Sequence, residues 1–254
     1  MEFPDFSLAG RKAIVTGASQ GIGRGIALAL ANAGADVAVT SRARERAEPT
    51  AAEIRRMGRG AIAVPLDVTE LRSIEAMVEA VAGEFGRIDI LVNNAGTNIP
   101  EEALAVTEEH WDTVVDTNLK GLFFCCQRVG RLMFEQHAGK IVNIASQMGL
   151  VGGQLRAAYC ASKGGVVQLT KVLAIEWAQK NINVNAVAPT FITTPLTEPM
   201  LADEEFRQQV LSSIPLGRVG DVQDVVGAVV YLASSSADLI TGHTLLVDGG
   251  WVAR

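Results

Sequence analysis

Residues 12–34 read KAIVTGASQGIGRGIALALANAG, and this stretch decides the fold. A short β-branched run, Lys12–Thr16, leads through glycines into a helical pattern over Ile22–Ala33. Glycine at Gly17, Gly21 and Gly23 permits a tight bend and lets a pyrophosphate approach the backbone, and the helix N-terminus offers free N–H groups. The stretch predicts a strand, turn and helix that bind a dinucleotide, although an ordinary tight turn uses the same glycines.

The alternation of strand and helix continues along the chain. Strands are predicted at Lys12–Thr16, Asp36–Thr40, Ala61–Leu66, Asp89–Asn93, Lys140–Ser146, Asn183–Ala188 and Thr244–Val247. Helices at Ile22–Ala33 and Ala47–Met57 separate the first three. Such alternation is typical of parallel sheets with right-handed crossovers. We expect the α/β class: a Rossmann-type doubly wound seven-stranded parallel sheet that forms a single dinucleotide-binding and catalytic domain over residues 1–254.

Residues 193–214 interrupt this alternation. They contain Pro195 and Pro199 and run up to Pro215, so they are expected to form a loop with short helices. Loops of this length inside a compact domain usually have a function. Because ligands of doubly wound sheets bind at the carboxyl ends of the strands, we expect a lid over the substrate here.

The composition limits the possible partners. The net charge of −6 argues against a nucleic-acid partner, which would require clustered basic residues. The three cysteines and three histidines have neither disulfide nor metal-ligand spacing, so no metal is expected. The N-terminal residues lack a signal pattern, and no apolar run approaches the roughly 18 residues of a membrane span. We expect a cytoplasmic protein that acts on a small molecule, with no membrane partner.

The residues after the second strand indicate which dinucleotide is bound. An acid at this point would hold the adenosine ribose 2′-hydroxyl and repel a 2′-phosphate. The strand DVAVT instead runs into Ser41 and Arg42, and a hydroxyl beside a guanidinium suits a phosphate through charge-assisted, forked hydrogen bonds. This favours NADP over NAD. The alternative is a solvated arginine in a run that also holds Arg44 and Arg46.

Two further strand ends carry candidate cofactor contacts. Asp67 and Val68 follow the third strand, where a carboxylate can accept from an adenine amino group. Residues 93–96, NNAG, end the fourth strand, where small side chains let a loop lie against a cofactor. Asn, Asp and Gly are also common turn residues, so turn chemistry alone explains either group.

Tyr159, Lys163 and Ser146 are the candidates for the reacting end. Tyr159 and Lys163 lie four residues apart in a helical pattern and therefore share a face. A phenol has a pKa near 10, and one ammonium about 4 Å away supplies roughly the 4 kcal/mol that lowers it to about 7. Ser146 ends the strand KIVNIAS and is expected to point to the same crevice. Taken one at a time, these residues have a purely structural interpretation: Tyr159 and Lys163 as a pair on a helix surface, and Ser146 as the cap of a strand.

Together these motifs resemble the short-chain dehydrogenase/reductase family over nearly the whole chain. The resemblance rests on TGASQGIG, NNAG, DTNLKG, NIAS, YCASK and VDGG. It places the catalytic tetrad at Asn118, Ser146, Tyr159 and Lys163. It implies that Tyr159 is the general acid/base, Ser146 positions the substrate oxygen, Lys163 hydrogen-bonds the nicotinamide ribose, and Asn118 holds a water that relays protons.

The resemblance and the strand ends together give the expected cofactor contacts. These are Gly17, Ser19, Gln20, Gly21, Ile22, Gly23, Ser41, Arg42, Asp67, Val68, Asn94, Ala95, Gly96, Tyr159, Lys163, Pro189, Ile192 and Thr194.

The chain departs from the family pattern at two positions. Thr190 stands where the family usually has glycine, a departure that concerns the local backbone conformation and not the chemistry. Gln20 stands where many NADP-dependent relatives have a basic residue, which leaves Arg42 to hold the phosphate without that partner. The resemblance also implies a homotetramer, with the C-terminal VDGGWVAR as a packing segment.

Several functions remain open for the substrate end. EWAQKNINVNAVAP and VDGGWVAR resemble most the gluconate 5-dehydrogenase and deoxygluconate dehydrogenase group, and Arg156 either faces a carboxylate or lies on the surface. A 3-oxoacyl carrier-protein reductase is the alternative enzyme. Arg131 matches one of its basic residues, whereas Ile175 occupies the place of the other. A non-catalytic dinucleotide-sensing protein is the alternative of another class, and the intact tetrad speaks against it.

Overall fold

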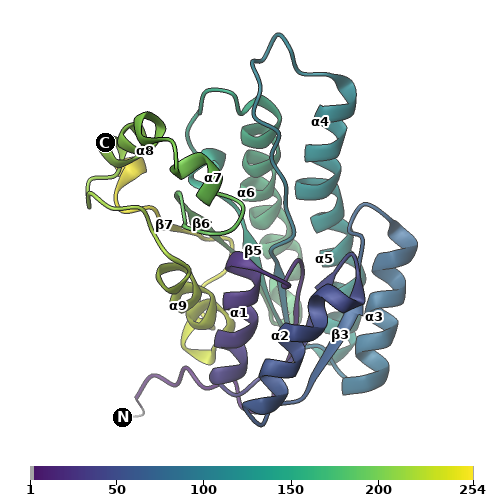
Figure 1. The fold of residues 1–254 in the computed structure, drawn as a ribbon. Helices are drawn as coiled ribbons and strands as arrows, with labels where there is room; N and C mark the ends of the chain where they lie inside the picture. The colour runs from purple at the N-terminus through teal and green to yellow at the C-terminus, as the bar shows by residue number, and fades with distance from the viewer. Residues whose placement is uncertain (1–2, 254) are drawn as a thin grey trace.

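The computed structural model describes residues 3–253 and confirms the predicted fold class. Seven parallel strands form one sheet in the order β3-β2-β1-β4-β5-β6-β7 (Figure 1). The strands are β1 Lys12–Val15, β2 Asp36–Ser41, β3 Ala61–Pro65, β4 Ile90–Asn93, β5 Gly139–Ile144, β6 Ile182–Pro189 and β7 Thr244–Val247.

The predicted strand bounds are correct to within two residues. Strands that are buried on both faces read as continuous apolar runs, and the central strands are buried almost throughout. One difference concerns the site, because β5 ends at Ile144 and Ser146 lies beyond it. Ser146 instead caps a short 3-10 turn, η2 Gln147–Gly149, and its Oγ accepts a hydrogen bond from the Met148 N–H at 3.1 Å.

The remaining elements are helical. They are α1 Gly21–Asn32, α2 Arg44–Arg56, α3 Leu71–Phe85, α4 Glu108–Val115, η1 Asp116–Lys120, α5 Gly121–Gln136, α6 Ala157–Trp177, η3 Ala178–Lys180, α7 Glu198–Leu201, α8 Glu204–Ser213, α9 Val222–Ala233, η4 Ser235–Ala237 and η5 Trp251–Ala253. The helix predicted at Ala47–Met57 therefore begins three residues earlier, at Arg44, and it includes Pro49.

Helices cover both faces of the sheet, as a doubly wound fold requires. One apolar cluster joins the sheet to α1, α2 and α9, and Ile26, Ile54 and Val229 are among its fully buried members. The other joins the opposite face to α3, α5 and α6, through residues such as Met77 and Met133. No helix within residues 3–253 is long and apolar enough to cross a membrane.

The strand order reverses between β1 and β4, and this reversal positions the site. The chain leaves β1 toward β2 and β3 on one side, and leaves β4 toward β5 and β6 on the other. The loops that follow β1 and β4 therefore diverge, and a crevice opens at the carboxyl ends of the strands. The segment with α7 and α8 lies above that edge of the sheet (Figure 1).

Candidate functional site

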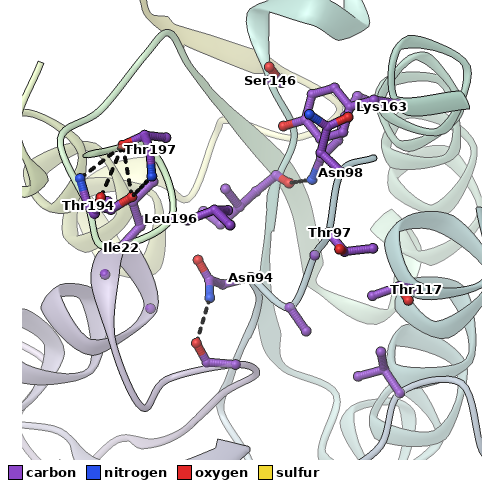
Figure 2. A pocket seen from close by; sticks show the side chains of 18 of the residues that line it. Ile22, Asn94, Thr97, Asn98, Thr117, Ser146, Lys163, Thr194, Leu196 and Thr197 are labelled. Atoms are coloured by element: carbon purple, nitrogen blue, oxygen red, sulfur yellow. Dashed lines mark hydrogen bonds between the residues drawn. The ribbon is translucent and has the colours of Figure 1, made fainter. Parts of the chain in front are cut away.

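A cavity of about 1660 Å³ lies at the carboxyl ends of the strands. All eighteen residues predicted to contact a cofactor line it, as does Ser146. Of the predicted tetrad, Asn118 alone does not line the cavity. Figure 2 shows Ser146 and Lys163 at one end, with Ile22 and Thr194 nearer the glycine turn.

The glycine turn presents an uncapped helix end to the cavity. Gly17 and Gly21 have φ of 63° and 55°, a region that favours glycine. Gln20 precedes α1 in extended conformation and makes no side-chain cap, and the first turn of α1 holds no acid. The first N–H groups of α1 therefore remain available, and the positive end of the helix dipole favours an anion. This end of the cavity fits a pyrophosphate.

Asn94 holds the glycine turn in place. Its Nδ2 donates to the carbonyl oxygens of Thr16 at 2.9 Å and Gly17 at 3.0 Å, and the dashed line from Asn94 in Figure 2 marks one of these bonds. A Cβ on Gly23 would lie 2.3 Å from both this Nδ2 and the Gly17 oxygen. The side chain of Asn94 is thus used to brace the loop after β1. Sequence reasoning missed Thr16 as the partner, whose Oγ1 accepts from the backbone N–H groups of Asn94 and Ala95.

Two guanidiniums line the cavity beside the end of β2. Arg42 and Arg46 are both exposed, and neither forms an ion pair with any described residue. Ser41 is buried beside them, and its Oγ donates to the Ala43 carbonyl at 2.6 Å. Arg46 was seen in the sequence only as part of a basic run. Arg46 lies in the first turn of α2, whereas Arg42 precedes the helix, so helical spacing in the sequence does not bring the two together.

Asp67 is partly engaged in a local turn. Its Oδ1 accepts from the N–H of Thr69 at 3.0 Å and from the Thr69 hydroxyl at 2.7 Å. Asp67 nevertheless lines the cavity, so the turn chemistry and the predicted adenine contact are compatible.

Asn118 lies on a five-residue π-helical segment, η1, inside the otherwise continuous helix from α4 to α5. The side chain is fully buried. Its Oδ1 accepts from the Thr97 N–H at 2.8 Å, and its Nδ2 donates to the Thr97 oxygen at 2.9 Å and to the Ser162 Oγ at 3.1 Å. Asn118 therefore ties the loop after β4 to α6. Single π-turns of this kind often occur at functional sites.

Lys163 is buried on the cavity side of α6. Its Nζ donates to the Ile144 carbonyl at 2.7 Å and lies 5.8 Å from the centre of the Tyr159 ring. Burial lowers the pKa of Lys163 from an ordinary 10.5 to about 8. The helix thus brings both side chains to one face, as four-residue spacing predicts.

The predicted lowering of the phenol pKa by Lys163 is wrong for the protein without a ligand. Burial raises the Tyr159 pKa above its ordinary value, while interaction with the Ser146 hydroxyl and the charge of Arg156 act in the opposite direction. Desolvation outweighs the charges here. Tyr159 is therefore protonated at neutral pH.

We expect the burial of Lys163 to make the free energy of unfolding depend on pH. Between pH 8 and 10.5 the unfolded chain binds a proton that the folded chain has released, so the free energy of unfolding rises with pH in this window. Relative to Lys163→Met, the wild type should gain about 2–3 kcal/mol between pH 7 and pH 10, from 1.36 kcal/mol per pKa unit. Urea unfolding of both proteins at pH 7 and pH 10 measures this gain. If the free energy of unfolding of the wild type and of Lys163→Met changed equally with pH, the lowered pKa of Lys163 would be excluded.

The departure at Thr190 is accommodated without strain. Thr190 does not have a positive φ, so the position does not require glycine. Its N–H donates to the Val247 carbonyl at 3.1 Å. The following segment is held by Thr197, whose Oγ1 donates to the Ile192 carbonyl at 2.5 Å and accepts from the Thr194 N–H at 3.0 Å (Figure 2).

Comparison with known proteins identifies relatives along nearly the full length. Residues 17–252 match the family described as enoyl-(acyl carrier protein) reductase. The chain is 42% identical over 250 residues to a 2-dehydro-3-deoxy-D-gluconate 5-dehydrogenase of Dickeya dadantii, covering 98% of each. It is 43% identical over 241 residues to a 3-oxoacyl-(acyl-carrier-protein) reductase of Staphylococcus aureus, covering 94% of this chain and 97% of that one.

A solved structure is similarly close. A gluconate 5-dehydrogenase from Burkholderia cenocepacia, in complex with NADP and tartrate, matches with a TM-score of 0.95 and 36% identity, covering 98% of both chains.

Proposed function

The chain belongs to the short-chain dehydrogenase/reductase family of oxidoreductases, and on this basis we propose that it interconverts a secondary alcohol and a ketone with NADP(H). One observation carries the proposal. Ser146, Tyr159 and Lys163 line the same cavity as the uncapped start of α1. A dinucleotide with its phosphates at α1 and its adenosine end at Arg42 and Arg46 would extend from there toward these three side chains.

Tyr159 transfers the proton in this proposal. Because burial raises its pKa, the phenol is in the form that donates a proton to a carbonyl oxygen, which suits ketone reduction. Ser146 holds the same oxygen through its hydroxyl. When bound, NADPH supplies the hydride to the carbonyl carbon, and the oxidised form accepts it in the reverse direction. Because the pKa of Lys163 is about 8, its side chain is mostly protonated at neutral pH. This positive charge lies beside the phenol and stabilises the phenolate that remains after proton transfer.

Asn118 is a positioning residue in this proposal. Its side-chain oxygen and nitrogen are occupied by Thr97 and Ser162, and it does not line the cavity. Its side chain is thus poorly placed to hold the relay water that the family resemblance implies. By fixing the loop after β4 against α6, Asn118 holds Lys163 opposite that loop.

We propose a sugar acid or a keto sugar as the substrate. The names of the relatives from Dickeya dadantii and Burkholderia cenocepacia support this class. The segment 193–214 acts as the lid, since Pro195, Leu196 and Met200 line the cavity and α7 and α8 are short.

The proposal is tested by the oxidation of NADPH and NADH, followed at 340 nm, with a panel of carbonyl compounds. The panel contains 5-ketogluconate, neutral keto sugars, acetoacetyl thioesters and cyclic diketones. We expect turnover with NADPH and a keto sugar acid. A preference for the thioesters would favour the carrier-protein reductase, for which the exposed Arg131 and the relative from Staphylococcus aureus speak. NADPH binding without any turnover would favour the sensor.

We also propose a homotetramer. The outer face of α6 exposes Val172 by 48% and Ile175 by 79%, and Leu246 on the edge strand β7 is exposed by 37%. Apolar groups on a helix face and a sheet edge suit burial between subunits. Of the predicted packing segment VDGGWVAR, residues 247–253 are described, and Arg254 lies outside the described residues.

Light scattering should give a mass four times the 26.9 kDa of the chain. The double variant Val172→Glu, Ile175→Glu should give a smaller mass, because two charges on this face would be costly to bury. A wild type with the mass of one chain would contradict the tetramer.

A further inference from the structure

Arg156 is a buried arginine at the reacting end of the cavity. It caps the start of α6, three residues before Tyr159, and its exposed fraction is only 8%. The preceding residue, Leu155, has a φ of 59°, a left-handed conformation that is uncommon for a bulky side chain. The chain thus turns sharply before Arg156, which lines the cavity.

No acid among residues 3–253 neutralises this guanidinium. Its Nη2 lies 3.9 Å from the Met200 sulfur, and its Nη1 lies 3.4 Å from the Leu155 carbonyl oxygen. Burial lowers the pKa of Arg156, and the groups that raise it are Tyr159 and Cys160, neither of which is a carboxylate. An arginine remains charged at neutral pH even so. An uncompensated buried charge is costly, and a bound anion would offset that cost.

Unpartnered polar groups surround the same cavity. Four of the seven buried side-chain atoms without a hydrogen-bond partner in residues 3–253 belong to Asn98, Gln147 and Thr190. All three residues line the cavity. Gln147 is only 1% exposed and follows Ser146 directly, and both its amide oxygen and its amide nitrogen lack a partner. Such groups are satisfied by a hydroxylated ligand and would remain unsatisfied beside an alkyl chain.

We infer that Arg156 binds the carboxylate of the substrate and that Gln147 hydrogen-bonds a substrate hydroxyl, so the site selects a polyhydroxylated carboxylic acid. The inference rests on the proposed function and assigns its substrate class to particular residues. The guanidinium offers a planar, forked set of donors that matches a carboxylate. Met200, which belongs to α7, contacts this guanidinium, so the lid segment lies directly against the proposed carboxylate site.

The test compares two ligands that differ only in the acid group. D-Gluconate carries a carboxylate where D-glucitol carries a hydroxymethyl group. Their dissociation constants are measured by calorimetry with and without NADPH, which cannot reduce either alcohol. The wild type should bind gluconate more tightly than glucitol. Arg156→Gln should weaken gluconate binding about 10- to 100-fold, the range for a lost charge-assisted hydrogen bond, and leave glucitol binding nearly unchanged.

Two further variants sharpen the comparison. Arg156→Lys should retain part of the preference, because it keeps the charge and loses the fork. Arg131→Gln removes an exposed arginine of α5 that does not line the cavity, and gluconate should bind to it as to the wild type. Circular dichroism and NADPH affinity report whether each variant is folded.

The outcomes separate the inference from the proposed reaction. Equal gluconate affinity of a folded Arg156→Gln and the wild type, or a wild type that does not distinguish the two ligands, overturns the carboxylate site. Reduction of 5-ketogluconate with an unchanged KM in Arg156→Gln overturns it as well, while the proposed reaction stands. If gluconate binding depends on Arg156 but no carbonyl compound is turned over, the carboxylate site is supported and the proposed reaction is contradicted.

Discussion

Tyr159→Phe should lower kcat for ketone reduction by at least about 100-fold, the low end of general acid/base catalysis. The phenol is the protonated group beside Ser146, and phenylalanine keeps the ring while removing the transferable proton. The ring stays on α6, 5.8 Å from the Lys163 Nζ, so the fold and the cofactor end should be little changed. Steady-state kinetics at pH 7 with NADPH measure the loss.

Binding measurements distinguish lost chemistry from lost structure. NADPH affinity and thermal stability of Tyr159→Phe should remain close to those of the wild type, because the phenol interacts with the Ser146 hydroxyl inside the cavity and phenylalanine keeps the packed ring. Ser146→Ala is the companion variant, since it removes the hydroxyl that positions the carbonyl oxygen and keeps Tyr159. A Tyr159→Phe enzyme with near-normal kcat would exclude Tyr159 as the proton donor.

Arg42→Ala should raise the dissociation constant of NADPH about 10- to 100-fold and that of NADH much less. The expected loss follows from about 1.5–3 kcal/mol for a hydrogen bond to a charged group and 1.4 kcal/mol per tenfold change. The physical reason is that Arg42 has no ion-pair partner among the described residues and lines the cavity beside Ser41. Arg46→Ala should act in the same direction, and the double variant should bind the two dinucleotides about equally.

Arg44→Ala is the matched control for this series. Arg44 is the first residue of α2, is exposed, and does not line the cavity. Its removal changes the net charge by the same amount and should leave NADPH affinity nearly unchanged. The NADPH affinity of each variant is measured by fluorescence titration at two salt concentrations. Salt screens the effect of distant exposed charges, so a direct contact between an arginine and the phosphate can be distinguished from the general effect of net charge. Equal weakening of NADPH and NADH by Arg42→Ala would exclude a phosphate contact.

Much of this architecture could be predicted because local chemistry determines it. The glycine turn needs Gly17 and Gly21 for positive φ, and the spacing of Tyr159 and Lys163 places them on one helix face. These features depend on residues close in sequence. The doubly wound class of the sheet could be predicted as well, since alternating strands and helices leave few topologies, whereas the strand order comes from the structure.

Other features depend on contacts between distant segments and could not be predicted. Desolvation of Tyr159 exceeds the effect of nearby charges, and it can be assessed only from the packing around α6. The bond from Asn94 to Gly17 joins residues 77 positions apart. The burial of Arg156 without an acid is also a tertiary property, because its sequence neighbours fit an exposed arginine equally well.

The π-helical segment η1 accommodates one extra residue between α4 and α5. The Gly121 N–H donates to the Asp116 carbonyl across five residues, so this turn contains one residue more than an α-turn. Deleting one residue between Asp116 and Lys120 would convert this wide turn to an α-turn and reorient the side chains of the segment, while α4 and α5 would keep nearly the same rotational phase. Such a deletion would move Asn118 away from Thr97. This helix should therefore tolerate conservative substitution on its surface far better than any change in its length.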